Sequence, residues 1–320
     1  MSHTILRPAS REEWLKIREG GIGSSEVGTI LGLNPFETPY QLWRRKLGID
    51  PPKEMNFAMR AGHYLEDAVS QFYQDETGKE IIKSSAGDWI IRCDDNPYMQ
   101  VSPDRTFWIP GLPKSGANKG ILECKTTQME VDADSVPQHW FAQLQYQMGV
   151  AELSQGALAW LTMGRTFGYR DFELDQDFFD YIKEEVMRFW IDNIQGKREP
   201  DMYNVDDVLL RNPRHTVGKS VEADDDLIDS CRELKEIKED LATLDARKKE
   251  LESMIKMAMG DAEALVAPPS PFGGKPVILA TWKAAKDSMK FDDKRFAKEM
   301  PDVFASYQFS SPGSRRFLLK

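Results

Sequence analysis

Cysteine, histidine and long apolar runs are all scarce in this chain of 320 residues, which has three cysteines and four histidines. Cys93, Cys124 and Cys231 stand far apart without a CxxC pair, which argues against a disulfide framework, a zinc knuckle and an iron–sulfur cluster. No apolar stretch approaches the roughly 18 residues of a membrane span, and the first residues include no hydrophobic signal segment. We therefore expect a protein of the reducing cytosol.

Positive charge is also in short supply, since 42 Lys and Arg against 52 Asp and Glu give a net charge of −10. Taken alone, this sum discourages a nucleic-acid partner. Phosphate binding depends on local potential, however, and basic residues are concentrated in Arg44-Arg45-Lys46 and in residues 271–320, which hold ten Lys and Arg against five Asp and Glu. A locally basic path for DNA is therefore compatible with an acidic chain, and a solvated basic face without a partner is the alternative.

Helical and strand-like segments alternate up to about residue 200. Ser10-Arg-Glu-Glu13 is a capping box that opens a short helix, and Thr38-Pro39 begins another. Apolar spacing predicts a long helix over 57–77, which Gly78 ends, and further helices over 137–151 and 176–195. Strand-like segments cover residues 80–83, 88–93, 99–108, 120–126, 156–163 and 167–173. This order predicts an α/β or α+β domain over residues 1–205, with a mixed central sheet flanked by helices.

The composition changes after a connector over residues 201–221, so residues 222–320 are predicted to form a C-terminal extension. A long charged helix is expected over 223–259, followed by a small basic α/β unit over 272–320. One face of the helix collects the apolar residues Leu227, Leu234, Ile237, Leu241, Leu244, Leu251, Ile255 and Ala258. This helix suits a coiled-coil arm, a ring contact or a docking place for a partner protein, and the pattern does not choose among them.

Two short motifs predict a site for a hard cation. In a strand, residues i and i+2 share a face, so Glu123 and Lys125 of Leu122-Glu-Cys-Lys125 project to the same side. If the segment Ser102-Pro-Asp104 is a neighbour, two carboxylates and an ammonium meet at one edge of the sheet. Oxygen ligands of this kind suit Mg²⁺, and such a site can cleave phosphodiesters.

Two further residues extend this site. Glu66, in Gly62-His-Tyr-Leu-Glu66 of the long helix, offers a third carboxylate, although a lone glutamate there would be an ordinary solvated residue. Arg18 precedes a loop and a helix start at Ser24-Ser25, so its guanidinium and the backbone amides could share one terminal phosphate. A surface ion pair of Arg18 with a nearby glutamate is the alternative.

These residues resemble a known family. Pro103-Asp104 with Glu123-Cys-Lys125 is similar to the PD-(D/E)xK nuclease signature, and the motifs GHYLE, SPD, ECK and Ala142-Gln-Leu-Gln-Tyr146 resemble those of lambda-type phage exonucleases. The string WLKIREGGIGSSEVGTILGLNPFETPYQLW resembles the start of the YqaJ-like viral recombinase branch. The resemblance covers about residues 10–200 and implies a PD-(D/E)xK nuclease core.

The resemblance implies a Mg²⁺-dependent exonuclease that degrades the 5′-ended strand of linear duplex DNA and leaves 3′ overhangs for phage-type single-strand annealing. It implies about two Mg²⁺ per site with Mn²⁺ as a substitute, a ring-shaped homotrimer, an annealing protein as partner, and a phage or prophage protein in the bacterial cytosol. It assigns Asp104, Glu123 and Glu66 to the metal, Lys125 to catalysis, Arg18 and Ser25 to the 5′-phosphate, and Gln143 and Tyr146 to the lining of the site.

Two other functions remain open from the sequence. The same metal core serves site-specific and structure-specific endonucleases, which cut closed circular DNA whereas an exonuclease needs an end. From a different class, the chain could be a non-catalytic DNA-binding scaffold or a scaffold for an annealing partner.

Tyr146 also has an alternative to the role that the resemblance implies, because its side chain could equally pack in the core.

Overall fold

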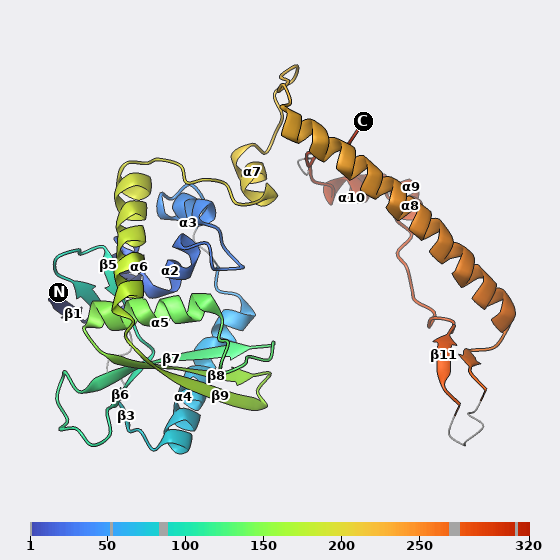
Figure 1. Cartoon of the computed structure of the whole chain (residues 1–320). Helices are drawn as coiled ribbons and strands as arrows, with labels where there is room; N and C mark the ends of the chain where they lie inside the picture. Colours follow the sequence, from blue (N-terminus) through green and yellow to red (C-terminus); the bar gives the residue numbers. More distant parts are fainter. Residues whose placement is uncertain (1, 52–53, 83–88, 269–275, 311–312) are drawn as a thin grey trace. The chain divides into compact units, whose positions relative to one another are not determined.

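The computed structural model describes residues 2–51, 54–82, 89–268, 276–310 and 313–320, and the chain divides into two units, Met1–Arg211 and Asn212–Lys320 (Figure 1). Parts of three predicted segments lie outside the described residues: Lys83 and Asp88 of two strands, and residues 272–275 and 311–312 of the C-terminal unit.

A five-stranded mixed sheet forms the centre of the first unit. Its strand order is β3-β6-β7-β8-β9, with β7 and β8 parallel and the other neighbours antiparallel. The strands are β3 (Ile81–Ile82), β6 (Arg105–Trp108), β7 (Lys119–Thr127), β8 (Gln155–Thr162) and β9 (Thr166–Glu173). The mixed central sheet predicted from the sequence is confirmed.

A second sheet has the order β1-β4-β5-β2, with β1 (His3–Leu6), β4 (Ile90–Cys93), β5 (Met99–Val101) and β2 (Ile22–Gly23). The single strand expected over 99–108 is wrong, because β5 belongs to this sheet and β6 to the other. Residues 102–104 cross between the two sheets, and Pro103, which lacks an N–H, cannot continue a ladder there. This crossing places Asp104 immediately before β6.

Helices α4 (Phe57–Thr77) and α5 (Gln138–Ala151) cover opposite faces of the central sheet (Figure 1). Val69 and Tyr73 of α4 pack with Leu122 and its neighbours on one face. Leu144 and Met148 of α5 lie in the other core cluster, with Ile121. Alternation along β7 therefore turns its odd-numbered residues, the predicted catalytic ones among them, toward α5.

The predicted caps of the shorter helices are present. Ser10 accepts a hydrogen bond from the Glu13 N–H, and Glu13 accepts one from the Ala9 N–H. The reciprocal bond of a capping box therefore goes to Ala9 rather than to Ser10, whereas Thr38 and Gln41 form a complete capping box. The long predicted helix from residue 176 changes to a π-helix at Phe189. The remaining helices of this unit are α1 (Arg11–Glu19), α2 (Ser24–Ile30), α3 (Pro39–Lys46), α6 (Gln176–Arg188), η1 (Phe189–Gln195) and α7 (Val205–Arg211).

The second unit contains the expected long helix, α8 (Asp225–Met259), whose first turn is capped by Asp224. Two antiparallel strands and two short helices follow, β10 (Ala264–Val266), β11 (Ile278–Thr281), α9 (Asp293–Glu299) and α10 (Pro301–Ser306). Among the described residues of α8, Met259 alone is buried.

Among the helices of the described residues, none is both long and apolar enough to cross a lipid bilayer.

Candidate active site

Strand β7 brings Glu123 and Lys125 together, as the two-residue period predicts. The Lys125 Nζ lies 2.7 Å from Glu123 Oε1, and the Glu123 side chain is 5% exposed. Strand β8 pairs with β7 from Gly120 to Thr127, and β6 pairs with its first residues, Lys119–Leu122. The pair therefore sits on a rigid strand rather than on a loop.

Helix α5 fixes both groups through two buried glutamines. Gln143 donates to Glu123 Oε1 at 2.5 Å and accepts from the Lys125 Nζ at 2.8 Å, while Gln147 donates to Glu123 Oε2 at 2.8 Å. Both oxygens of the Glu123 carboxylate thus have defined partners. The role of Gln147 is not evident from the family motifs, although its position one turn after Gln143 puts the two on one helix face.

Asp104 and Glu66 complete a group of three acids. Asp104 Oδ2 accepts a hydrogen bond from the backbone N–H of Cys124 at 2.8 Å, so the carboxylate is aligned with the middle of β7. Burial raises the pKa of Asp104 well above its usual range, and the charges of Glu123 and Glu66 raise it further. Burial also raises the pKa of Glu66, whose carboxylate lies 3.1 Å from the His63 Nδ1. The three carboxylates are therefore close enough to repel one another.

Tyr146 occupies a different place from the one that the resemblance implies. Its ring is fully buried, and its hydroxyl donates to the carbonyl of Ile22 at 3.2 Å. It is absent from the residues that line the cleft. Tyr146 packs in the core and supports the segment around β2, because it is about 100° around the helix from Gln147 and so leaves the face on which Gln143 and Gln147 reach Glu123.

Arg18 and Ser25 lie side by side, with the Arg18 Nη2 3.3 Å from Ser25 Oγ. The Arg18 guanidinium also lies 4.5 Å from the ring centroid of Trp14, and Arg11 lies 3.8 Å from the same centroid. A Cβ on Gly23 would stand 2.6 Å from the Arg18 Nη2, so a side chain at this position would displace the guanidinium. The resemblance assigns no role to Arg11 or Trp14. Trp14 and Arg18 follow Arg11 by three and seven residues, and this spacing, which puts all three on one helix face, is the sequence signal for them.

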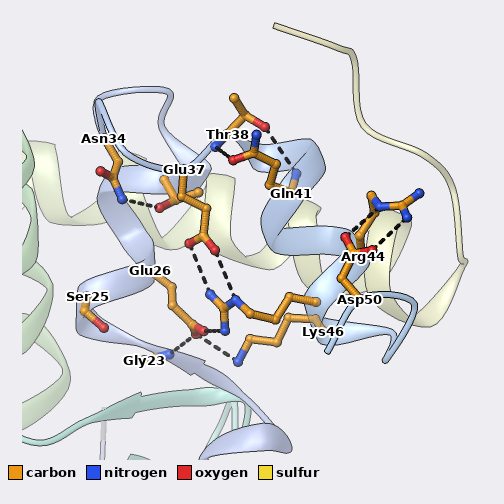
Figure 2. A network of polar contacts seen from close by, with 12 residues as sticks. Gly23, Ser25, Glu26, Asn34, Glu37, Thr38, Gln41, Arg44, Lys46 and Asp50 are labelled. Atoms are coloured by element: carbon orange, nitrogen blue, oxygen red, sulfur yellow. Dashed lines mark hydrogen bonds and ion pairs between the residues drawn. The ribbon is translucent and has the colours of Figure 1, made fainter. Parts of the chain in front are cut away.

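A buried ion network supports the loop that follows Arg18 at the end of α1 (Figure 2). The Lys46 Nζ lies 2.9 Å from Glu26 Oε2 and donates to the Gly21 carbonyl at 2.5 Å. Glu26 also accepts from the Gly23 N–H at 2.8 Å and from Arg45, which is paired in turn with Glu37. Burial acts to raise the pKa of Glu26, but the charges of Lys46, Arg45 and Arg18 outweigh it, so the pKa lies below its usual value. Two residues of the predicted basic run, Arg45 and Lys46, thus face Glu26 and hold the loop, while Arg44 pairs with Asp50.

One cleft of about 1060 Å³ collects most of the predicted site. It is lined by the predicted residues Arg18, Ser25, Glu66, Asp104, Glu123, Lys125 and Gln143, together with Arg11, Trp14 and Ser24. The acids and the lysine, which are up to 59 residues apart in the chain, therefore share a space with the arginine and serine of the N-terminal segment.

The donor set suits a divalent cation. Three carboxylates around one cleft are hard oxygen ligands. Burial and the charges of Glu123 and Glu66 both raise the pKa of Asp104, and a cation would offset both effects. Within the described residues, no three His, Cys, Asp or Glu side chains are already drawn into a metal cluster. Instead, Glu123 contacts the amides of Gln143 and Gln147 and the ammonium of Lys125. To bind Mg²⁺, Glu123, Asp104 and Glu66 would exchange some of their present contacts for the cation.

Comparison with known proteins gives three kinds of match. The model of the YqaJ-like viral recombinase domain matches residues 13–154. The uncharacterized protein YqaJ of Bacillus subtilis is 30% identical over 322 residues, which cover 97% of this chain and 94% of the relative. Among solved structures, an alkaline exonuclease from Laribacter hongkongensis is 18% identical with a TM-score of 0.44, over 58% of this chain and 93% of that one. A phage-related exonuclease from Haemophilus somnus is 13% identical with a TM-score of 0.39, over 56% of this chain and 96% of that one.

Proposed function

The chain belongs to the YqaJ-like viral recombinase family, and from that premise we propose that it is a Mg²⁺-dependent exonuclease acting 5′ to 3′ on linear double-stranded DNA. Its product is a 3′ single-stranded overhang for single-strand-annealing recombination. The observation that carries the proposal is the shared cleft, in which three carboxylates and a lysine lie together with Arg18 and Ser25. A phosphodiesterase needs the first set, and recognition of a phosphorylated end needs the second.

Lys125 is suited to act on the scissile phosphate. Its ammonium has three N–H donors, and the contacts with Glu123 and Gln143 use two of them. The third can orient the attacking water or offset the charge that develops on a phosphoryl oxygen. Gln143 fixes the direction of that donor because it binds both Lys125 and Glu123.

Asp104, Glu123 and Glu66 are the residues that would hold Mg²⁺, which when bound polarises a phosphoryl oxygen and acidifies water. Asp104 is kept in place by the Cys124 N–H, and Glu123 by the amides of α5. We propose about two Mg²⁺ per site, with Mn²⁺ as a substitute. We also propose that the protein forms a ring-shaped homotrimer, works with a single-strand annealing protein and acts in the cytosol of a bacterial host.

A single digestion experiment tests activity, polarity and the need for an end. Linear duplex DNA is labelled separately at each 5′ and 3′ terminus and incubated with the protein and Mg²⁺, beside closed circular DNA and a chelator control. We expect early release of 5′ labels, late release of 3′ labels, an intact circle and no digestion with chelator. Cutting of the circle would favour a site-specific or structure-specific endonuclease, and lack of all digestion would favour a non-catalytic scaffold.

Arg18→Ala tests recognition of the 5′-phosphate. Wild-type protein is expected to digest a 5′-phosphorylated duplex about ten- to a hundredfold faster than a 5′-hydroxyl duplex, the range of a charge-assisted contact worth about 1.5–3 kcal/mol. Arg18→Ala should remove this difference and leave the slower rate. Arg188→Ala is the matched control, since Arg188 is exposed and paired with Glu185 outside the cleft. If wild-type protein ignores the terminal phosphate, the role of Arg18 is refuted.

A further inference from the structure

The apolar face of α8 follows a seven-residue repeat. Position a is occupied by Leu227, Leu234, Leu241, Lys248 and Ile255, and position d by Ser230, Ile237, Leu244, Leu251 and Ala258. Eight of these ten residues are apolar, and the row spans 32 residues, or about 48 Å at 1.5 Å per residue. A repeat of this length is the pattern of a coiled-coil helix rather than of a helix lying on a globular core.

The described part of the second unit does not cover this row. Leu241 is 59% exposed and Leu244 is 66% exposed, at the middle of the helix. Leu227, Ile237, Leu251 and Ile255 are also exposed. Since a coiled-coil face of this kind is stable only against another helix, the charges beside the row can identify the partner.

The flanking charges are self-complementary when two copies of α8 run in opposite directions. With Leu241 of one copy facing Leu244 of the other, Lys238 lies near Asp245 of the second helix and Asp240 lies near Arg247. Each contact occurs twice by symmetry, and no like charges meet. Shifting the helices by one heptad in either direction places Asp245 of one copy against Asp245 of the other, or Lys238 against Lys238. Like charges then repel, so the charges select the unshifted register.

A parallel pair is less favourable. It would place Lys248 against Lys248 in the apolar row and Asp240 against Asp245 at the flank, although Glu233 would meet Lys238 and Arg247 would meet Glu252. In the antiparallel pair Lys248 faces Ile237 instead, so its stem can lie along the row while its ammonium reaches water. We propose that α8 is a self-association arm that pairs with α8 of a second copy of this chain as an antiparallel coiled coil.

Thiol cross-linking tests both the pairing and its direction. Cys231 is exposed, whereas Cys93 and Cys124 are buried, so Cys231 is the natural thiol open to a short bis-maleimide. In the antiparallel pair Cys231 lies near position 252 of the second copy, and in a parallel pair near position 226. We expect full-length Glu252→Cys protein to shift from 36.6 kDa to twice that mass on a denaturing gel, whereas wild type and Asp226→Cys stay at the monomer mass.

The Glu252→Cys background also carries the controls. Cys231→Ser should abolish the covalent dimer, and so should Leu241→Glu with Leu244→Glu, while Ala246→Glu on the outer face of the helix should leave it in place. Circular dichroism verifies that each variant retains its helix content. A covalent dimer from Asp226→Cys would overturn the antiparallel direction. Failure of both folded cysteine variants to form a dimer would overturn self-association and leave α8 to a helix of another protein.

Discussion

Lys125→Ala lowers the rate of Mg²⁺-dependent digestion of linear duplex DNA by about a thousandfold, the upper range for removing one donor aimed at developing charge. The ammonium that Glu123 and Gln143 hold in the cleft is lost, and alanine offers no donor in its place. Binding of duplex DNA, measured in the presence of chelator, is expected to change little because Arg18 and the rest of the cleft remain. The measurement is the initial rate of release of a 5′ label.

Two variants on the same strand sharpen this result. Lys119→Ala is the matched control, since Lys119 begins β7 and its Nζ lies over the Trp108 ring, outside the cleft. It should digest DNA at the wild-type rate. Glu123→Ala should be as inactive as Lys125→Ala, because one loses a carboxylate and the other the ammonium beside it. Digestion by Lys125→Ala at the wild-type rate would refute the active-site assignment.

Glu26→Gln lowers the free energy of unfolding by about 3–5 kcal/mol, the cost of leaving a buried charge without its partner. The Lys46 side chain is 6% exposed, and its ammonium pairs with Glu26. Glutamine keeps a carbonyl for the Gly23 N–H but removes the negative charge. The measurement is chemical denaturation followed by tryptophan fluorescence, with Trp14 and Trp43 buried in the first unit as reporters.

A double variant separates charge from packing. Glu26→Gln with Lys46→Met should recover much of the lost free energy, because it removes the uncompensated cation. Glu37→Gln is the milder control, since Glu37 is more exposed and Arg45 retains Glu26. If Glu26→Gln costs no more than Glu37→Gln, the network does not carry the loop. We also expect Glu26→Gln to weaken the preference for a 5′-phosphate. Lys46, which pairs with Glu26, holds the Gly21 carbonyl in the loop that follows Arg18.

Acid should weaken the same network. Because folding lowers the pKa of Glu26, its contribution to stability is complete above its ordinary pKa in the unfolded chain. That contribution is then lost as the pH falls through the lowered value in the folded protein. The difference in unfolding free energy between wild type and Glu26→Gln is therefore expected to shrink at acid pH.

Local patterns predicted the elements on which the site stands. The helix of Phe57–Thr77 and its Gly78 cap agree with the expected bounds, because capping and apolar period act within one segment. The pairing of Glu123 with Lys125 follows from strand geometry alone. The convergence of Asp104 and Glu66 on that pair was only a conditional prediction from the motifs, which the resemblance then implied, since sequence spacing cannot fix which segments become neighbours.

Other features depend on tertiary contacts that no local pattern contains. The division of the segment around Pro103 between two sheets follows from the pairing of β5 with β4 and of β6 with β7. The basic run of α3 looks like a solvent-facing surface in the sequence, but Lys46 is turned inward by Glu26. Tyr146 and Gln147 are adjacent, yet one supports Ile22 and the other binds Glu123, because neighbouring helix positions differ by about 100°.

The antiparallel pairing of α8 restricts the number of chains in a closed assembly to an even number. Two helices related in this way have a twofold axis between them, so each arm is satisfied by one mate and cannot accept a third. In a ring with an odd number of copies, pairing of α8 helices within the ring leaves one α8 unpaired. If the proposed trimeric ring forms, complete pairing of its arms must join two rings, and the smallest closed particle then contains six chains.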